Sequence, residues 1–445
     1  MSSVIDVEHW EQRLRVLAER HGVPGAQLGI LRQDELVTVA AGILHAGSGA
    51  PATVDSMWQL GSITKVWTAT LIMQLIDEGH LALDTPVPGL PLGVTVRHLL
   101  THTSGIDGDV FTDTGRGDDC LERYVAGLAD VAQNQPVGAT WSYCNSGFVV
   151  LGRIVEQVTG QTWDRAVRER LVAPLGLQRT CTLPEEVLRH PHATGHVTTL
   201  PEARITALAT LPRSMGPAGL LTSDAADLLA FARMHMAGGV AADGTRLLAE
   251  RSALAMRTHQ VECPGKNGIA DAWGLGWCLH DWGADELYGH DGTTIGQSAF
   301  LRILPRAGLA VTLLTNVLDA KELCRELFGE IFGALAGTAP PAPIRIPRQP
   351  VEADIGRHLG TYRRESFLLE VYEEDGEPRL RVTVTGPFAA MAPEPVTTYV
   401  LAPVAENLYA ATAPGQSCPS PVHFSVLPTG ASYVHLGGRA APRVD

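Results

Sequence analysis

Hydrophobic residues near the start of the chain follow helical spacing first and strand spacing afterwards. Val7, Trp10, Leu14 and Leu17 recur every three or four residues, which predicts an amphipathic helix. Residues 26–44, AQLGILRQDELVTVAAGIL, then form one apolar run and one alternating run around a polar turn, which is typical of two paired strands. The chain is therefore expected to begin with a helix and a hairpin.

A second helix is predicted to begin at Ser62, with Gly79 just after its end. Its apolar positions are Val66, Ala69, Ile72, Met73 and Ile76. Further helices are predicted at residues 162–176 and 223–239, the second with Ser223 as its N-cap. Strand patterns return at residues 298–316. Strands, then many helices, then strands again indicate an α+β fold in which the N- and C-terminal segments share one sheet.

The last quarter of the chain differs in character from the rest. Residues 338–350, TAPPAPIRIPRQP, contain five prolines and favour an extended linker. Beyond them, short strand patterns alternate with turn residues, including two runs around Asp375-Gly376, and predict a small antiparallel β-barrel. We therefore expect an α+β unit over residues 1–337, a linker over 338–350 and a barrel over 351–445.

Charge and cysteine content narrow the function classes. The net charge is −14, the sequence pI is about 5.6 and no Lys/Arg run is present, so nucleic acid is not an expected partner. The seven cysteines are scattered without a C-x-x-C spacing, which argues against a disulfide framework or a zinc site and favours a reducing compartment. Since the N-terminus lacks a secretory apolar core and no run is long enough to span a membrane, a soluble, cytoplasmic protein is expected.

Ser62 and Lys65 lie three residues apart among apolar neighbours, at GSITKVWTA. On a helix they face the same side, so the amine can take the proton of the hydroxyl if the amine is neutral. Bringing the ordinary lysine pKa of about 10.4 near 7 costs about 4 to 5 kcal/mol, which burial and nearby positive charge can supply. The alternative is a helix cap followed by a surface lysine. Only three lysines occur beside 31 arginines, which favours a specific need for a titratable amine here.

Two further segments carry candidate chemistry. Tyr143 and Asn145 flank Cys144 before a helix expected to begin near Gly147; a phenol can relay protons, and an amide can hold a carbonyl. The alternative is a buried tyrosine beside a turn asparagine, and Cys144 is interpreted as a packing residue. His290-Asp291-Gly292 precedes a strand, but His-x-Gly also occurs at residues 45–47 and 435–437, so its order in the chain singles it out.

Together these motifs resemble the class C β-lactamase and serine DD-peptidase superfamily, which includes D-aminopeptidases, esterases and penicillin-binding-protein-type thioesterases. The resemblance covers residues 20–335 and rests on the following ordered segments: Ser62-Ile-Thr-Lys65, LLTHTSGI (99–106), Tyr143-Cys-Asn145, GLGW (274–277) and His290-Asp-Gly292. Tyr-x-Asn and His-x-Gly are nearer to DD-peptidases and D-aminopeptidases than to true β-lactamases, which normally show Lys-Thr-Gly. The resemblance implies a β-lactamase/transpeptidase-like domain with an antiparallel sheet, flanking helices and an all-helical region, followed by a lipocalin-like barrel.

The resemblance also implies roles for these residues. Ser62 would attack an acyl carbon, Lys65 and Tyr143 would share its proton, and Asn145 would orient the acyl amide. His290 would support Tyr143, and the N–H groups of Ser62 and Thr293, beside Gly292, would form the oxyanion hole. No cofactor or metal is implied.

Several functions are compatible with such a site. The resemblance favours a hydrolase or acyltransferase acting on an ester, thioester or amide of a small molecule or a D-residue-containing peptide. Its sharpest special case is a stand-alone thioesterase that releases and cyclises nonribosomal peptides from a carrier protein. Alternatives are a D-aminopeptidase, carboxylesterase or β-lactamase-type hydrolase, and a catalytically silent binding domain.

Two further features were weighed for ligand binding. His190, His192 and His196 have spacing that a metal could use, but they lie in a polar segment without an acidic partner, so a metal site is not expected. Arg439, at the end of the barrel, is either an interdomain contact or a partner for a substrate carboxylate at the mouth of the site.

Overall fold

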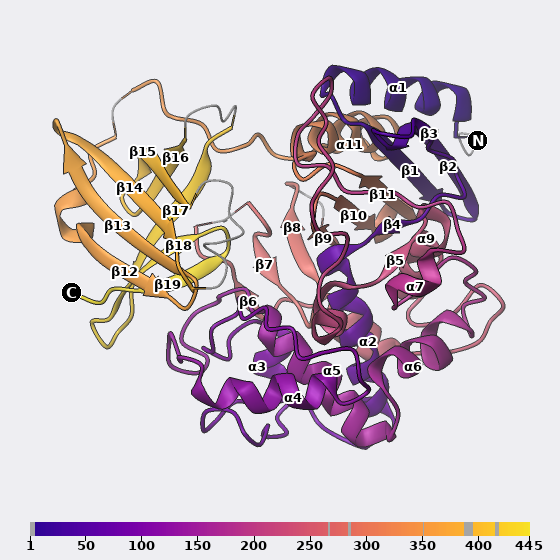
Figure 1. The fold of residues 1–445 in the computed structure, drawn as a ribbon, viewed down its shortest axis with the longest axis horizontal. Helices are drawn as coiled ribbons and strands as arrows, with labels where there is room; N and C mark the ends of the chain where they lie inside the picture. The colour runs from indigo at the N-terminus through magenta and orange to yellow at the C-terminus, as the bar shows by residue number, and fades with distance from the viewer. Residues whose placement is uncertain (1–4, 266–267, 284–285, 350, 387–394, 414–417) are drawn as a thin grey trace.

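A large antiparallel sheet and a smaller β-barrel form the two parts of the molecule (Figure 1). The computed structural model describes residues 5–265, 268–283, 286–349, 351–386, 395–413 and 418–445. Within these ranges the large sheet has the strand order β3-β2-β1-β11-β10-β9-β8-β7-β6. Its strands are β1 (Gly25–Arg32), β2 (Glu35–His45), β3 (Ala50–Pro51), β6 (Val261–Glu262), β7 (Ala272–Trp273), β8 (Cys278–Asp281), β9 (Glu286–Thr293), β10 (Ser298–Leu304) and β11 (Leu309–Thr315).

The two ends of the α+β unit meet in this sheet, as predicted. The expected N-terminal hairpin is β1 paired with β2, and β1 also pairs with β11 in antiparallel register from Ala26 opposite Thr315 to Arg32 opposite Leu309. Strands β10 and β11 are the two runs predicted within residues 298–316. Since β1 is buried along almost its whole length, it is a central strand covered on both faces.

Helices cover both faces of the sheet (Figure 1). On one face, α1 (Val7–Arg20) and α11 (Lys321–Ala336) pack together on the strands, and Trp10, Leu14 and Leu17 are buried as predicted. Val7 is exposed, because it lies at the outer end of α1. On the opposite face, α9 (Ala225–Met236) contacts β1 and β11.

A helical region continues from α9 and is built around α2 (Thr64–Asp77), whose residues from Thr64 to Leu75 are all buried. An all-round buried helix is the centre of a core, and amphipathic helices surround it. The helices of this region are α3 (Val96–Leu100), α4 (Cys120–Ala126), α5 (Asn145–Thr159), α6 (Trp163–Val167), α7 (Pro184–Val187), α8 (Gly216–Gly219) and α10 (Glu250–Met256). Shorter turns are η2 (Gly127–Asp130), the π-helical η3 (Arg168–Val172), η4 (Arg213–Met215), η5 (Pro305–Ala307) and η6 (Ile355–His358).

One predicted cap is wrong. Ser223 does not cap α9; it lies in β5 (Thr222–Ser223), which pairs with β4 (Trp58–Gln59). The cap is Asp224, whose carboxylate accepts a hydrogen bond from the backbone of Asp227. Both side chains can cap a helix, and the pairing of Ser223 with Trp58 moves the helix start one residue along.

The C-terminal strands form the predicted barrel. In the described residues the strand order is sequential from β12 to β19, and an antiparallel bridge between Tyr362 and Arg443 joins the first strand to the last. Tyr362, Tyr409 and Phe424 fill the interior. The strands are β12 (Gly360–Arg364), β13 (Phe367–Glu374), β14 (Glu377–Val384), β15 (Val396–Ala405), β16 (Leu408–Thr412), β17 (Ser420–Val426), β18 (Ser432–Leu436) and β19 (Arg439–Pro442).

The turn between β13 and β14, the linker and the cysteines agree with the sequence patterns. Asp375 and Gly376 form the turn between β13 and β14, both with positive φ, as a tight hairpin turn requires. Residues 338–349 contain neither helix nor strand. All seven cysteine thiols are free, in agreement with their scattered spacing. None of the helices in the described ranges is long and apolar enough to cross a membrane.

Candidate active site

Ser62 and Lys65 meet at the start of the buried central helix. Lys65 Nζ lies 3.0 Å from Ser62 Oγ and donates a second hydrogen bond of 2.6 Å to the carbonyl of Ala218. Lys65 is completely buried, whereas Ser62 is partly exposed and can be reached by a ligand. The helix starts later than predicted: Ser62 lies in a 3-10 turn, η1 (Gly61–Ile63), and α2 begins at Thr64.

The end of β9 packs directly against the Ser62 turn, and glycines make this approach possible. A Cβ atom on Gly292 would lie 1.9 Å from the carbonyl oxygen of Leu60 and 2.9 Å from the amide nitrogen of Ser62. A Cβ atom on Gly61, whose φ is +52°, would lie 2.7 Å from the amide nitrogen of Thr293. The backbone at Ser62 and Thr293 is therefore brought together without intervening side chains.

Tyr143 and Asn145 come to the site from the start of α5. The helix begins at Asn145, two residues before the predicted Gly147, because the buried thiol of Cys144 caps it by accepting a hydrogen bond from the Gly147 amide. The Tyr143 ring is buried, with its centroid 5.0 Å from Lys65 Nζ. Burial raises the pKa of the Cys144 thiol to about 12, which fits its interpretation as a packing residue.

His290 lies beside Tyr143, in β9, and precedes the predicted strand, which is β10. The two ring centroids are 6.3 Å apart, and His290 Nδ1 is 2.6 Å from the carbonyl oxygen of Asp291. Burial lowers the pKa of His290 to about 3, so its imidazole is neutral at physiological pH. The predicted site residues are thus gathered around α2, α5 and β9. They are Ser62, Lys65, Tyr143, Asn145, His290, Gly292 and Thr293.

Burial disfavours the charged form of both titratable groups next to Ser62, Lys65 and Tyr143. Desolvation lowers the pKa of Lys65 well below its ordinary value, and the positive charge of Arg439 lowers it further. Desolvation raises the pKa of the Tyr143 phenol, while Ser62 and Arg439 counteract part of that rise. The Tyr143 hydroxyl has no hydrogen bond of ordinary geometry to any described residue. The site therefore favours the neutral form of both the amine and the phenol.

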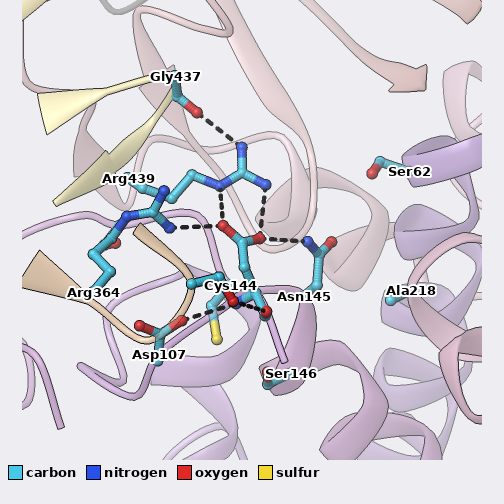
Figure 2. A network of polar contacts seen from close by, with 12 residues as sticks. Ser62, Asp107, Cys144, Asn145, Ser146, Ala218, Arg364, Gly437 and Arg439 are labelled. Atoms are coloured by element: carbon cyan, nitrogen blue, oxygen red, sulfur yellow. Dashed lines mark hydrogen bonds and ion pairs between the residues drawn. The ribbon is translucent and has the colours of Figure 1, made fainter. Parts of the chain in front are cut away.

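The buried carboxylate of Asp109 links the α+β unit to the barrel. Asp109 accepts a hydrogen bond of 3.1 Å from Asn145 Nδ2, one of 2.7 Å from Arg364 and two of 3.1 Å from Arg439. Figure 2 shows Arg364 and Arg439 approaching Asn145 from the side opposite Ser62. Burial alone would raise the pKa of Asp109, but the two guanidinium groups hold it well below its usual range.

Arg439 is placed at the site, and three of its five N–H donors take part in hydrogen bonds within the protein. Nε and Nη2 bind Asp109, and Nη1 donates to the carbonyl of Gly437 at 2.8 Å. Its guanidinium carbon lies 4.8 Å from the centroid of the Tyr143 ring. Arg439 is therefore an interdomain contact, and its pairing with a substrate carboxylate stays a prediction.

Sequence reasoning missed three members of the site. Asp109 and Arg364 carry the interdomain ion pairs, and His102 stacks on the Tyr143 ring with centroids 4.3 Å apart. His102 has a φ of +58° and accepts a hydrogen bond from the Cys144 amide through Nδ1. Its position inside the quoted LLTHTSGI segment was the available signal. No pattern connected Asp109 with an arginine of the barrel.

A cavity of about 390 Å³ adjoins this network on the side of the barrel. It meets the site at Asp109, Arg364 and Arg439, and most of its remaining wall is apolar. Those remaining residues are Phe111, Ser366, Phe367, Leu369, Val382, Tyr399, Leu436 and Gly437. Its size is in the range of small-molecule pockets.

The histidine cluster weighed for metal binding is used for internal hydrogen bonds. His196 Nδ1 lies 2.8 Å from the carbonyl of Asn316, and Nε2 accepts from the Ala46 amide. His192 Nδ1 lies 2.9 Å from the carbonyl of His190. In the described ranges no group of three or more His, Cys, Asp or Glu is arranged to hold a metal.

Known proteins resemble this chain in sequence and in fold. Residues 10–328 match the Beta-lactamase family. Penicillin-binding protein 4 of Amycolatopsis lactamdurans is 46% identical over 375 residues, which cover 81% of this chain and 98% of that protein. The D-aminopeptidase of Brucella anthropi is 25% identical over 306 residues, or 66% of this chain and 56% of that protein.

A solved structure extends the likeness over the whole chain, including the barrel. The crystal structure of SurE aligns with a TM-score of 0.79 and 32% identity, covering 98% of this chain and 99% of SurE. A second structure of the same protein, SurE with D-Leu, aligns equally well. By sequence and by fold, this chain belongs to the Beta-lactamase family and is a serine hydrolase of that family.

Proposed function

We propose that Ser62 is the nucleophile of an acyl-enzyme reaction and that Lys65 is its general base. The observation that carries this proposal is the 3.0 Å contact between Lys65 Nζ and Ser62 Oγ, with the amine completely buried and the hydroxyl partly exposed. A neutral amine donates one hydrogen to the carbonyl of Ala218 and keeps a lone pair for the Ser62 proton.

Acylation then follows from the positions of the remaining groups. Lys65 takes the proton of Ser62 while Oγ bonds to the acyl carbon, and the carbonyl electron pair moves onto its oxygen. The N–H groups of Ser62 and Thr293 stabilise this oxyanion, each contributing about 3 to 4 kcal/mol. The bond to the leaving group breaks as Tyr143 gives it a proton, Lys65 passes its proton to Tyr143, and an ester on Ser62 remains.

Asn145 and His290 take supporting roles in this proposal. Asn145 is fixed through Nδ2 by Asp109, which leaves its carbonyl oxygen to accept a hydrogen bond from the acyl amide of a substrate. His290 is neutral and buried beside Tyr143, so it shapes the pocket without adding charge.

We propose a D-configured amino acyl group as the acyl donor. Two relatives support this: SurE, solved with D-Leu, and the D-aminopeptidase of Brucella anthropi, named for D-residues. A peptidyl thioester from a carrier protein, attacked by its own amine to give a cyclic peptide, is the special case that we favour.

The second candidate is simple hydrolysis, in which water accepts the acyl group. The match to Penicillin-binding protein 4 over 98% of that protein supports a penicillin or a related amide as an acylating compound. The two candidates share the ester on Ser62 and differ in the acceptor. The product, a cyclic peptide or a free acid, distinguishes them.

The test combines intact-mass measurement with product analysis. The protein is incubated with a fluorescent penicillin, with a fluorophosphonate and with peptidyl thioesters that end in either a D- or an L-residue. We expect an adduct on the wild type, its loss in Ser62→Ala and its retention in Ser48→Ala, an exposed serine elsewhere. Preference for the L-thioester would contradict the D-donor, and an unchanged adduct in Ser62→Ala would contradict the nucleophile.

A further inference from the structure

Two basic side chains from different parts of the chain lie near one aromatic ring. Lys65 Nζ, on α2, is 5.0 Å from the centroid of Tyr143, and the guanidinium carbon of Arg439, on β19, is 4.8 Å from the same centroid. Both distances are within the range of a cation–π contact. The barrel therefore places a permanent positive charge at the same ring as Lys65, the residue that must be neutral to activate Ser62.

Arg439 is held rigidly in this position. Two of its nitrogens bind the two oxygens of Asp109 at 3.1 Å each, in the bidentate geometry that fixes a guanidinium group best. A third nitrogen donates to the carbonyl of Gly437. The Asp109 side chain is 9% exposed and the Arg439 side chain 23% exposed, so the ion pair is partly shielded from water and from salt.

The same carboxylate also holds the amide of Asn145. Asp109 Oδ1 accepts from both Arg439 Nη2 and Asn145 Nδ2, each at 3.1 Å. Figure 2 shows the Arg439 and Asn145 side chains converging in this network. A displacement of Arg439 would therefore be transmitted through Asp109 to the amide that faces the substrate.

Among the groups that act on Lys65, Arg439 is the one that carries a positive charge. Burial raises the pKa values of the neighbouring phenol and thiols and lowers those of the imidazoles, so these groups are neutral at physiological pH. They are Tyr143, Cys144, Cys278, His102 and His290. Asp109 and Arg439 remain charged among the groups that act on Lys65. Since Asp109 is paired with both Arg364 and Arg439, this cluster has a net charge of about +1.

We propose that Arg439, presented by the barrel and held by Asp109, is a positioning residue of the acylation site: it disfavours a second positive charge at Lys65 and keeps Asn145 in place. This inference rests on the proposed function of Lys65 as the base. It makes the barrel an electrostatic part of the active centre and assigns Asp109 the role of holding Arg439.

The test is the pH dependence of Ser62 acylation, measured as the burst of nitrophenol from a nitrophenyl ester in a single turnover. Lys65 acts when deprotonated, so the rate rises with pH through the pKa of Lys65. In Arg439→Gln we expect this rise to move to higher pH by about one unit. At pH values below the pKa of Lys65 the acylation rate then falls about tenfold, and at pH values above it the rate equals that of the wild type. Arg439→Lys keeps the charge and is expected to return the rise toward the wild-type position.

Two further variants separate charge from structure. Arg364→Gln removes one bond to Asp109 and one positive charge of the cluster, but it leaves the cation at the Tyr143 ring, so we expect a smaller shift to higher pH than in Arg439→Gln. Arg443→Gln, four residues along the chain and paired with Asp445, is expected to match the wild type. Thermal unfolding of each variant confirms that the barrel is folded.

The possible outcomes separate a failure of this inference from a failure of the proposed function on which it rests. If the wild type acylates Ser62 but Arg439→Gln keeps the same pH profile, or loses the same factor at every pH, the inference on Arg439 is overturned. A shift in Arg439→Gln that Arg439→Lys does not reduce would also overturn it. If the wild type forms no ester on Ser62, the proposed function fails and this inference fails with it.

Discussion

The contacts of Lys65 show how a single residue can be kept neutral. The described structure gives Nζ two hydrogen-bond partners, the hydroxyl of Ser62 and the carbonyl of Ala218, and neither is charged. A protonated amine buried in this way would lack a carboxylate partner, and such an unpaired buried charge is strongly destabilising. Burial also favours the neutral phenol of Tyr143. A proton passed from this phenol to the neutral amine would create an ion pair, so burial opposes that transfer in the resting site.

Tyr143→Phe tests the proposed proton donor. The phenol is needed when the leaving group must be protonated, so we expect a loss of about 10² to 10⁴-fold in acylation by an amide or an alkyl ester. A nitrophenyl ester has a leaving group that departs as an anion, and its acylation is expected to fall much less. Steady-state and burst kinetics on both substrate types give the comparison. Equal losses on the two would show that Tyr143 does not protonate the leaving group.

At the level of elements, the site depends on the contact between strand β9 and the turn η1. Backbone atoms of the two elements approach so closely that a methyl group on Gly292 would overlap the carbonyl of Leu60. The N–H groups of Ser62 and Thr293 are held by this contact rather than by their side chains. Preorganised donors of this kind stabilise an oxyanion most effectively.

Gly292→Ala is expected to separate β9 from η1 and to disturb the proposed oxyanion hole. We expect acylation of Ser62 to fall by about 10² to 10³-fold, the effect of losing one oxyanion donor. Gly127→Ala, where a Cβ atom would have no neighbour within 4 Å, is the control and is expected to leave the rate unchanged. The rate of acylation by a fluorescent penicillin measures both. A wild-type rate in folded Gly292→Ala would contradict this description of the hole.

Element types followed from hydrophobic spacing, whereas element boundaries depended on hydrogen bonds that spacing does not show. The strands β1, β2, β10 and β11 and the barrel were predictable because alternation and turn residues agree there. The start of α5 was not, because its cap is the Cys144 thiol, an unusual acceptor. The start of α9 moved from Ser223 to Asp224 because Ser223 pairs with a distant strand.

Across the whole molecule, the barrel forms part of the wall of the site. The backbone of Gly438 accepts a hydrogen bond from the Tyr143 amide at 2.8 Å, and Ala440 donates to the Ser142 hydroxyl at 3.1 Å. Asp109 and Arg439 are 330 residues apart in the chain. A local pattern could predict the barrel and the presence of Arg439 near the mouth, but it could not predict which carboxylate Arg439 binds.

Gly438→Ala tests the docking of the barrel. A Cβ atom there would lie 2.5 Å from Ile269 Cδ1 and 3.2 Å from the Trp141 ring, so either the Ile269 side chain or the turn that binds Tyr143 must shift. We expect a loss of acylation of about tenfold or more, in line with a small misplacement of reacting groups. Gly437→Ala is the matched control, because Gly437 also has a positive φ but no neighbour within 4 Å of its Cβ position. Equal effects of the two changes would indicate backbone strain rather than displaced docking.

The most direct test of the central claim, that Lys65 is uncharged when Ser62 attacks, is the pH dependence of Ser62 acylation in the wild type and in Lys65→Met. The folded pKa of Lys65 is lowered, so the amine becomes protonated, and the rate falls, only when the pH drops through that lowered value. The account predicts a rise in rate centred far below the ordinary lysine pKa of about 10.4, and its disappearance in Lys65→Met. A rise centred near that ordinary value, or one that persists in Lys65→Met, would contradict it.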